Sequence, residues 1–196
     1  MSKLPTVAII GQANVGKSSL FNRLTRSRTA IVAREAGTTR DNVVGKVSYK
    51  RRNVDSAPSD DYSQFWLIDT AGLKTAEDEF EATIQDQIAD ASAAADVILV
   101  TVDSTVYPSD ADRQLAKKAL KSGKPVILIA NKADLKGSLS IDEFKRLGIK
   151  NIIKTSAEHS IGISELLDSI AELIPPATET APDDIIRVAL IGRPNV

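Results

Sequence analysis

Short apolar runs rich in valine and isoleucine alternate along this chain with segments whose apolar residues recur at helical spacing. The apolar runs predict six strands: Thr6 to Ile10, Val43 to Tyr49, Gln64 to Ile68, Val97 to Val102, Val126 to Ala130 and Asn151 to Lys154. The helical patterns run over about Lys17 to Thr25, Ile84 to Ala94, Asp110 to Lys121, Ile141 to Leu147 and Ile163 to Ile174. This alternation predicts an α/β fold in three layers, a mostly parallel sheet with helices on both faces.

The composition narrows the class of protein. Of the 196 residues, 42% are hydrophobic and 26% are charged, which is typical of a globular domain rather than a disordered chain. A net charge of -1 argues against a dominating nucleic-acid patch on this chain. The absence of cysteine excludes disulfides, thiolate catalysis and zinc–thiolate sites. With no secretion signal and no apolar run long enough to span a bilayer, we expect a cytoplasmic domain without a membrane partner.

A glycine-rich motif lies between the first predicted strand and the first predicted helix. Gly11, Gly16, Lys17 and Ser18 fit the pattern G-x-x-x-x-G-K-S in the strand–helix context that a phosphate-binding loop needs. Its amides and the helix N-terminus favour phosphate oxygens. We expect Lys17 to neutralise the β- and γ-phosphates and the Ser18 hydroxyl to bind Mg²⁺. Further predicted nucleotide contacts in this loop are Asn14, Val15 and Ser19. The motif alone also fits an ATPase or a small-molecule kinase.

The sequence of the first strand and the start of its loop occurs a second time at the end of the chain. Val188 to Val196 repeats the apolar strand and the start of the loop. The last predicted helix is stopped by Pro175-Pro176, and a polar, proline-bearing stretch follows. We therefore expect one domain over residues 1–176, a linker over 177–184, and the opening strand and truncated loop of a second domain over 185–196. Residues 50–63 predict a long exposed hairpin tip.

Two further segments are expected to face the phosphates. Asp69 follows an apolar strand, so its carboxylate should face the crevice at the carboxyl end of the sheet and hold Mg²⁺ through water. The Gly72 amide could approach a γ-phosphate unobstructed. A segment around Thr39 is expected to close over Mg²⁺ and the γ-phosphate and to release after hydrolysis. Thr38 is the close competitor, because spacing does not separate the two threonines.

The residues after the next two strands predict which base is bound. Asn131, Lys132 and Asp134 follow the strand that ends at Ala130. Guanine presents N1–H and N2–H₂ side by side, and one carboxylate can accept from both. Adenine would leave the Asp134 carboxylate unpaired, at a cost of roughly 1–3 kcal/mol or more. In the following loop, the Ala157 amide is expected to reach guanine O6 while Ser156 braces the loop.

Together these segments resemble the translation-factor-related GTPases, and among them the Der (EngA) family of tandem GTPases. The resemblance is carried by Asn14 to Leu24, Gly37 to Asp41, Asp69 to Leu73, Asn131 to Asp134 and the restart at Gly192 to Val196. Single-domain relatives such as Era, and the tRNA-modification GTPase MnmE, share most of these motifs; only the restart favours Der. Gln12-Ala13 departs from the Arg-Pro usual in the family, and the tip at residues 50–63 is long for it.

The resemblance implies a Ras-like P-loop NTPase fold with a mostly parallel six-stranded sheet, and a bacterial GTPase that assists assembly of the large ribosomal subunit. Its partners would be ribosomal RNA, a second GTPase domain and a KH-like domain. Asn14 matches an asparagine that helps to bind K⁺ in potassium-activated relatives. Leu73 stands where Ras-like proteins carry a water-positioning glutamine, so slow intrinsic turnover is expected.

The leading hypothesis is a GTP-hydrolysing switch with GTP or GDP, Mg²⁺ and K⁺ as cofactors. Its expected catalytic residues are Lys17, Thr39, Gly72 and Asn14, and its expected metal contacts are Ser18, Thr39 and Asp69 for Mg²⁺ and Asn14 for K⁺. One alternative is a nucleotide-gated binding module with negligible hydrolysis. Another is a single-domain GTPase like Era or MnmE. A P-loop kinase or ATPase would require Asp134 to be incidental.

Overall fold

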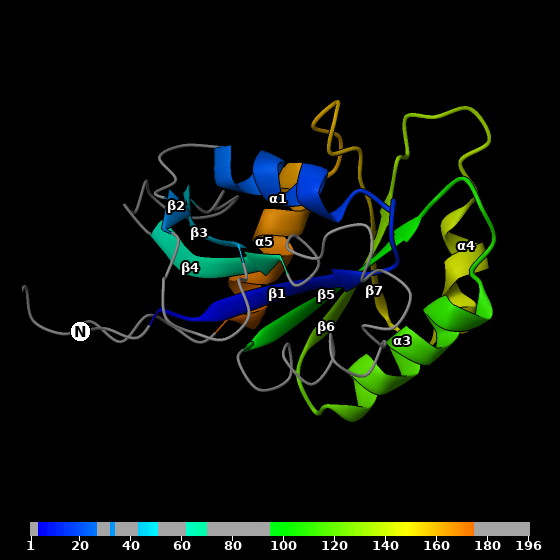
Figure 1. Ribbon diagram of the computed structural model, residues 1–196, viewed down its shortest axis with the longest axis horizontal. Helices are drawn as coiled ribbons and strands as arrows, with labels where there is room; N and C mark the ends of the chain where they lie inside the picture. The colour runs from blue at the N-terminus through cyan, green and yellow to red at the C-terminus, as the bar shows by residue number, and fades with distance from the viewer. Residues whose placement is uncertain (1–3, 27–31, 34–42, 51–61, 70–94, 175–196) are drawn as a thin grey trace, which may run out of the picture.

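The computed structural model describes residues 4–26, 32–33, 43–50, 62–69 and 95–174. These residues form one twisted sheet with helices on both faces (Figure 1). The three-layer arrangement predicted from the alternating pattern is therefore confirmed. The predicted helix at 84–94, the hairpin tip, the linker and the second domain's opening strand lie wholly or largely outside the described residues.

The sheet contains the six predicted strands and one short addition. Its order is β2-β3-β4-β1-β5-β6-β7. The strands are β1 (Thr6–Gly11), β2 (Val32–Ala33), β3 (Val43–Lys50), β4 (Tyr62–Asp69), β5 (Val97–Asp103), β6 (Val126–Asn131) and β7 (Asn151–Lys154). β3 runs antiparallel to β2 and β4, and the other pairs are parallel. The edge strand β2 was not predicted, because two residues are too few to establish a periodicity.

The helices follow the predicted order; the one predicted over Asp110 to Lys121 has those bounds, whereas the other described helices differ at or near their C-terminal ends. They are α1 (Lys17–Arg26), α3 (Asp110–Lys121), α4 (Ile141–Phe144) with the 3₁₀ turn η1 (Lys145–Leu147), and α5 (Ile163–Leu173). One helix was predicted over residues 141–147, whereas the chain tightens to 3₁₀ at Lys145 and turns at Gly148 with a φ of 78°. The helix α5 stops one residue early, since Pro175 disfavours helical backbone at Ile174.

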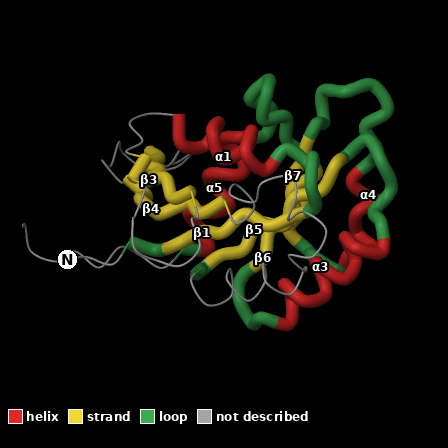
Figure 2. The backbone as a smooth tube through the Cα atoms, viewed as in Figure 1, coloured by secondary structure: helices red, strands yellow, loops and turns green. Residues whose placement is uncertain are grey.

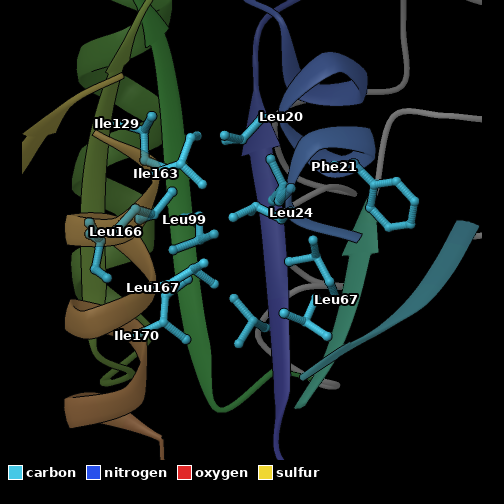
Figure 3. Packing of buried hydrophobic residues seen from close by; sticks show 14 of the residues in the cluster. Leu20, Phe21, Leu24, Leu67, Leu99, Ile129, Ile163, Leu166, Leu167 and Ile170 are labelled. Carbon is cyan, nitrogen blue, oxygen red and sulfur yellow. The ribbon is translucent and has the colours of Figure 1, made fainter. Parts of the chain in front are cut away.

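Alternate residues of the strands build two hydrophobic clusters, one on each face of the sheet. Val7 and Ile9 of β1 face α1 and α5, whereas Ala8 and Ile10 face α3 and α4. Figure 3 shows Leu20 and Leu24 of α1 and the apolar residues of α5 packing over the same side of the central strands. Burying each such side chain contributes roughly 1.5–3 kcal/mol, so these clusters fix the positions of the strand ends.

The loops that matter for function project from one end of this scaffold. Because β1, β5, β6 and β7 are parallel, their carboxyl ends lie at the same edge. In Figure 2 the loops after β6 and β7 leave this edge beside the segment that enters α1. Within the described ranges, no helix has the length and apolar character needed to cross a membrane.

Candidate nucleotide-binding site

The loop between β1 and α1 turns through two residues with positive φ. Asn14 and Gly16 adopt left-handed φ values of 63° and 93°. A Cβ added at Gly16 would overlap the Nδ2 atom of Asn131, which passes directly against the loop. Glycine at position 16 therefore serves two purposes, because it permits the positive φ and leaves room for the Asn131 side chain.

Lys17 lies inside this loop rather than on the surface. Its Nζ atom donates to the carbonyl oxygens of Gly11 at 2.9 Å and Gln12 at 2.6 Å, and the residue is only 6% exposed. Burying an ammonium is costly unless its donors are paired. The loop carbonyls meet part of this requirement and hold the positive charge where an anion can approach it.

Ser18 and Asp69, the two predicted magnesium contacts in the described residues, lie together. The Ser18 hydroxyl donates to Oδ2 of Asp69 at 3.0 Å. The parallel pairing of β1 with β4, with Asp69 opposite Ile9, brings the carboxylate to this edge. Hydroxyl and carboxylate oxygens are ligands that Mg²⁺ accepts, and two protein donors leave positions for water and phosphate oxygens. The residues present therefore fit the expected ion.

Gln12, noted as a departure from the family sequence, fastens the loop to the start of α3. Its Nε2 atom donates to Ser109 Oγ and to Asp112 Oδ1, both at 2.7 Å. Ser109 and Asp112 form the capping box of α3. The capping pattern is visible in the sequence, but its contact with a residue about a hundred positions earlier is not.

A pocket begins at the loop and continues beneath the segments after β6 and β7. Its lining residues are Gly16, Ser19, Asn131, Lys132, Asp134, Leu135, Ser156, Ala157 and Glu158. Apart from Leu135 and Glu158, all of these are residues that the sequence predicted to contact the nucleotide. The structure thus joins the predicted phosphate loop and the predicted base-reading residues in one continuous site.

Asn131 connects the two ends of this site. Its Nδ2 atom donates to the Val15 carbonyl at 3.0 Å, while its Oδ1 atom accepts from Thr155 Oγ1 at 3.1 Å and the Ala157 amide at 3.2 Å. The residue is 2% exposed. One buried amide side chain therefore sets the position of the phosphate loop relative to the segment after β7.

Asp134 lies at the pocket as an ionised carboxylate. A hydrogen bond from the Ser156 side chain lowers its pKa below the ordinary value, and the partial burial of the group only partly offsets this. His159 Nε2 lies 3.5 Å from Oδ2 of Asp134. An aspartate carboxylate is charged at neutral pH, and the lowered pKa lets it keep this charge, and its capacity to accept hydrogen bonds from a ligand, at more acidic pH.

Lys132 is engaged differently from the other predicted contacts. Its Nζ atom forms a 2.6 Å ion pair with Asp103 at the end of β5. Burial raises the pKa of Asp103, but hydrogen bonds from Lys132 and Thr105 outweigh it, so the pKa is lowered overall. The ammonium of Lys132 is thus directed to Asp103, and the residue lines the pocket from a backbone with a φ of 66°.

Four residues predicted to act at the site lie outside the described part of the chain, and one side chain that contacts the site was not predicted. Thr39, its competitor Thr38, Gly72 and Leu73 lie outside the described residues. Arg23 of α1, by contrast, was not singled out by sequence, yet its side chain donates to the Ala157 and Glu158 carbonyls. An arginine on the polar side of a helix gives no sequence signal that separates this role from simple solvation.

The fold and this site define a P-loop domain of the GTPase class, with a lysine-bearing phosphate loop and an Asn-Lys-x-Asp segment in one pocket. Residues 6–132 match the family described as 50S ribosome-binding GTPase, and the chain belongs to that family. Among curated proteins it is similar to GTPase Der of Gemmatimonas aurantiaca, at 41% identity over 98% of this chain and 42% of that protein. GTPase Der of Myxococcus xanthus gives the same identity and coverage. The chain thus spans less than half the length of these relatives.

Solved structures agree with this assignment. Era of Aquifex aeolicus bound to GDP and AlF4⁻ matches with a TM-score of 0.65 and 28% identity, over 97% of this chain and 63% of that one. The cytosolic domain of the T. maritima FeoB iron transporter in its GMPPNP form matches with a TM-score of 0.58 and 26% identity, over 97% of this chain and 69% of that one. Both relatives were solved with guanine nucleotides, and guanine-nucleotide binding is the function that this fold and site support.

Proposed function

We propose that this chain is a Mg²⁺-dependent, K⁺-stimulated GTP-hydrolysing switch domain. The observation that carries the proposal is the pocket itself. It runs from Gly16 of the phosphate loop to the ionised Asp134, and the buried Asn131 ties the two ends together. At one end, a triphosphate would neutralise the Lys17 ammonium of the phosphate loop. At the other end, a guanine base would donate hydrogen bonds to the Asp134 carboxylate.

The chain's own residues divide the work of binding. Lys17 and the loop amides neutralise and orient the β- and γ-phosphates, and Gly11, Val15, Gly16 and Ser19 shape the loop around them. Asp134 accepts from N1–H and N2–H₂ of guanine, and the Ala157 amide donates to O6 while sharing its long 3.2 Å hydrogen bond to Asn131 Oδ1. Ser156 supports this end by holding the Asp134 carboxylate.

Hydrolysis depends on charge stabilisation around the phosphates. Bound cations supply positive charge that offsets the charge developing on the β–γ bridge and its neighbours. Ser18 and Asp69 would hold Mg²⁺, and Asn14 would hold K⁺ from the outer side of the loop, where it is exposed with a left-handed backbone. Thr39 and Gly72 would sense the γ-phosphate and release after hydrolysis, as the sequence predicts.

The measurement that tests the proposal is multiple-turnover GTP hydrolysis with Mg²⁺ in KCl compared with NaCl. We expect faster turnover in KCl, and we expect Asn14→Gly to bring the KCl-to-NaCl ratio close to 1. Glycine is the right replacement because it removes the side-chain oxygen without straining the positive φ. GTP binding without turnover in either salt would instead support a nucleotide-gated binding module.

In the full-length protein, we propose that this domain works beside a second GTPase domain and a KH-like domain in assembly of the large ribosomal subunit. Support comes from the family description, from the curated relatives named GTPase Der, and from their greater length. Co-sedimentation of the full-length protein with 50S subunits should be stronger with a non-hydrolysable GTP analogue than with GDP. Equal sedimentation with both nucleotides would argue against a switch that acts on the ribosome.

A further inference from the structure

The segment after β7, which reads the base in the proposed function, is held from outside by a residue of α1. Arg23 Nε donates to the Ala157 carbonyl at 2.7 Å, and Nη2 donates to the Glu158 carbonyl at 2.6 Å. The rigid fork of the guanidinium thus fixes two successive peptide units at once. The contact joins residues 134 positions apart in the sequence, and it ties the loop to the helix that begins with Lys17 and Ser18.

Fixing these carbonyls also fixes the direction of the neighbouring amides. In a planar trans peptide the C=O of one residue and the N–H of the next point in opposite directions. With the Ala157 carbonyl held toward α1, the Glu158 N–H points away from that helix, and Glu158 lines the pocket. The Ala157 N–H, one peptide earlier, is directed to the Oδ1 atom of Asn131.

Other contacts close the turn of the loop after β7. Ser156 and Ile161 exchange backbone hydrogen bonds of 3.0 and 3.2 Å, and the His159 amide donates to Ser156 Oγ at 3.1 Å. These contacts close the turn but leave the Ala157 and Glu158 carbonyls to Arg23. Asn131 thus holds the Ala157 amide, and the guanidinium supplies the contact that orients the Glu158 amide.

We propose that Arg23 is a positioning residue for base recognition. By holding the Ala157 carbonyl, it directs the Glu158 amide of the same peptide unit toward the pocket, beside the Ala157 amide that is proposed to reach the oxygen at position 6 of the purine. Asp134, by contrast, reads the N1 and N2 edge. This inference rests on the proposed guanine recognition, but it assigns the two edges of the base to two separately testable groups.

The test compares the affinities of GTP, 6-thio-GTP and ITP for the wild-type chain and Arg23→Ala. 6-Thio-GTP has a weaker acceptor at position 6 and keeps the N2 amine, whereas ITP keeps the oxygen at position 6 and lacks the N2 amine. We expect Arg23→Ala to reduce the preference for GTP over 6-thio-GTP by about tenfold, the size of one net hydrogen bond. The preference for GTP over ITP, which belongs to Asp134, should stay within about twofold.

Two further variants separate positioning from general damage. Arg23→Lys keeps the charge but offers a single donor group, so its preference for GTP over 6-thio-GTP should fall between wild type and Arg23→Ala. It also serves as the test if Arg23→Ala does not fold. Arg113→Ala removes an exposed arginine that pairs with Asp110 on α3, and it should leave both preferences unchanged.

The outcomes distinguish this inference from the function on which it rests. A wild-type chain that does not prefer GTP over ITP would contradict the proposed reading of guanine by Asp134. A wild-type preference for GTP over ITP, together with a 6-thio-GTP preference that is absent or that neither Arg23 variant changes, would overturn only the role of Arg23. A loss of folding stability alone would weaken all three nucleotides equally and would leave both ratios at their wild-type values, which also counts against the proposal.

Discussion

Replacing Lys17 with alanine is expected to lower kcat/KM for GTP by about 10²- to 10³-fold, the effect typical of removing one preorganised group that stabilises transition-state charge. The reason lies in the position of the side chain. Its ammonium is buried in the loop and held by the Gly11 and Gln12 carbonyls, so its charge is fixed before the nucleotide arrives. The measurement is GTP hydrolysis under single-turnover conditions, together with the affinities for GTP and GDP.

A matched control removes the same charge elsewhere. Lys117→Ala takes away an exposed lysine of α3 and should leave kcat/KM within about twofold, because a solvated charge on that surface interacts weakly with the phosphates. Nearly wild-type hydrolysis by Lys17→Ala would mean that the buried ammonium is structural. Urea unfolding of the nucleotide-free variant separates the two cases, since the loss of a structural lysine would lower the free energy of unfolding.

The predicted site residues that the structure brings together share one property: each lies at the end of a strand or follows one. The carboxyl ends of parallel strands meet at one edge, so Lys17 after β1 and the Asn131–Asp134 segment after β6 had to converge. Asp69 at the end of β4 follows the same rule. The hydrophobic pattern predicted the strands, and the short polar motifs after the strands predicted the residues of the site.

The parts that escaped prediction depend on how side chains meet across the fold. Gln12 reaches the capping box of α3, Arg23 reaches the loop after β7, and Lys132 turns to Asp103. Each of these contacts is set by the distance and tilt between packed elements, which a periodicity of apolar residues does not encode. The same holds for the change from α to 3₁₀ helix at Lys145, where a helix of four residues has little stability of its own.

Three side-chain contacts hold the parts of this site together. Gln12 anchors the phosphate loop to α3, Asn131 links that loop to the segment after β7, and Arg23 links the same segment back to α1. The motif residues supply the charges and donors, while these three side chains hold the motifs at fixed separations. In the proposed function, preorganisation of this kind allows one pocket to bind a triphosphate and to read a base at the same time.

Replacing Asp134 with asparagine is expected to change the preferred base from guanine to xanthine. Asparagine keeps one acceptor but presents an amide donor where the carboxylate accepted from N2–H₂, and xanthine carries an oxygen at that position. Hydrogen bonds to charged groups contribute about 1.5–3 kcal/mol, so the affinity for GTP should fall by about 10- to 100-fold while the affinity for XTP rises. Competition of GTP, XTP and ITP against a fluorescent guanine nucleotide for wild type, and against a fluorescent xanthine nucleotide for the variant, measures all three.

The relative affinities for GTP, ITP and XTP show whether Asp134 reads the base. Wild type should prefer GTP over ITP, because only GTP offers the N2 amine to the carboxylate, whereas Asp134→Asn should bind GTP and ITP almost equally. Asp142→Asn makes the same chemical change at an exposed aspartate of α4 paired with Lys145, and it should keep the wild-type order. If Asp134→Asn instead keeps its affinity for GTP and its preference for GTP over ITP, another group reads the base.

Ser156 offers a second test of the same carboxylate, since its hydrogen bond lowers the Asp134 pKa. Ser156→Ala should raise that pKa. GTP binding should then weaken first at acidic pH, because the proton competes for the carboxylate at a higher pH.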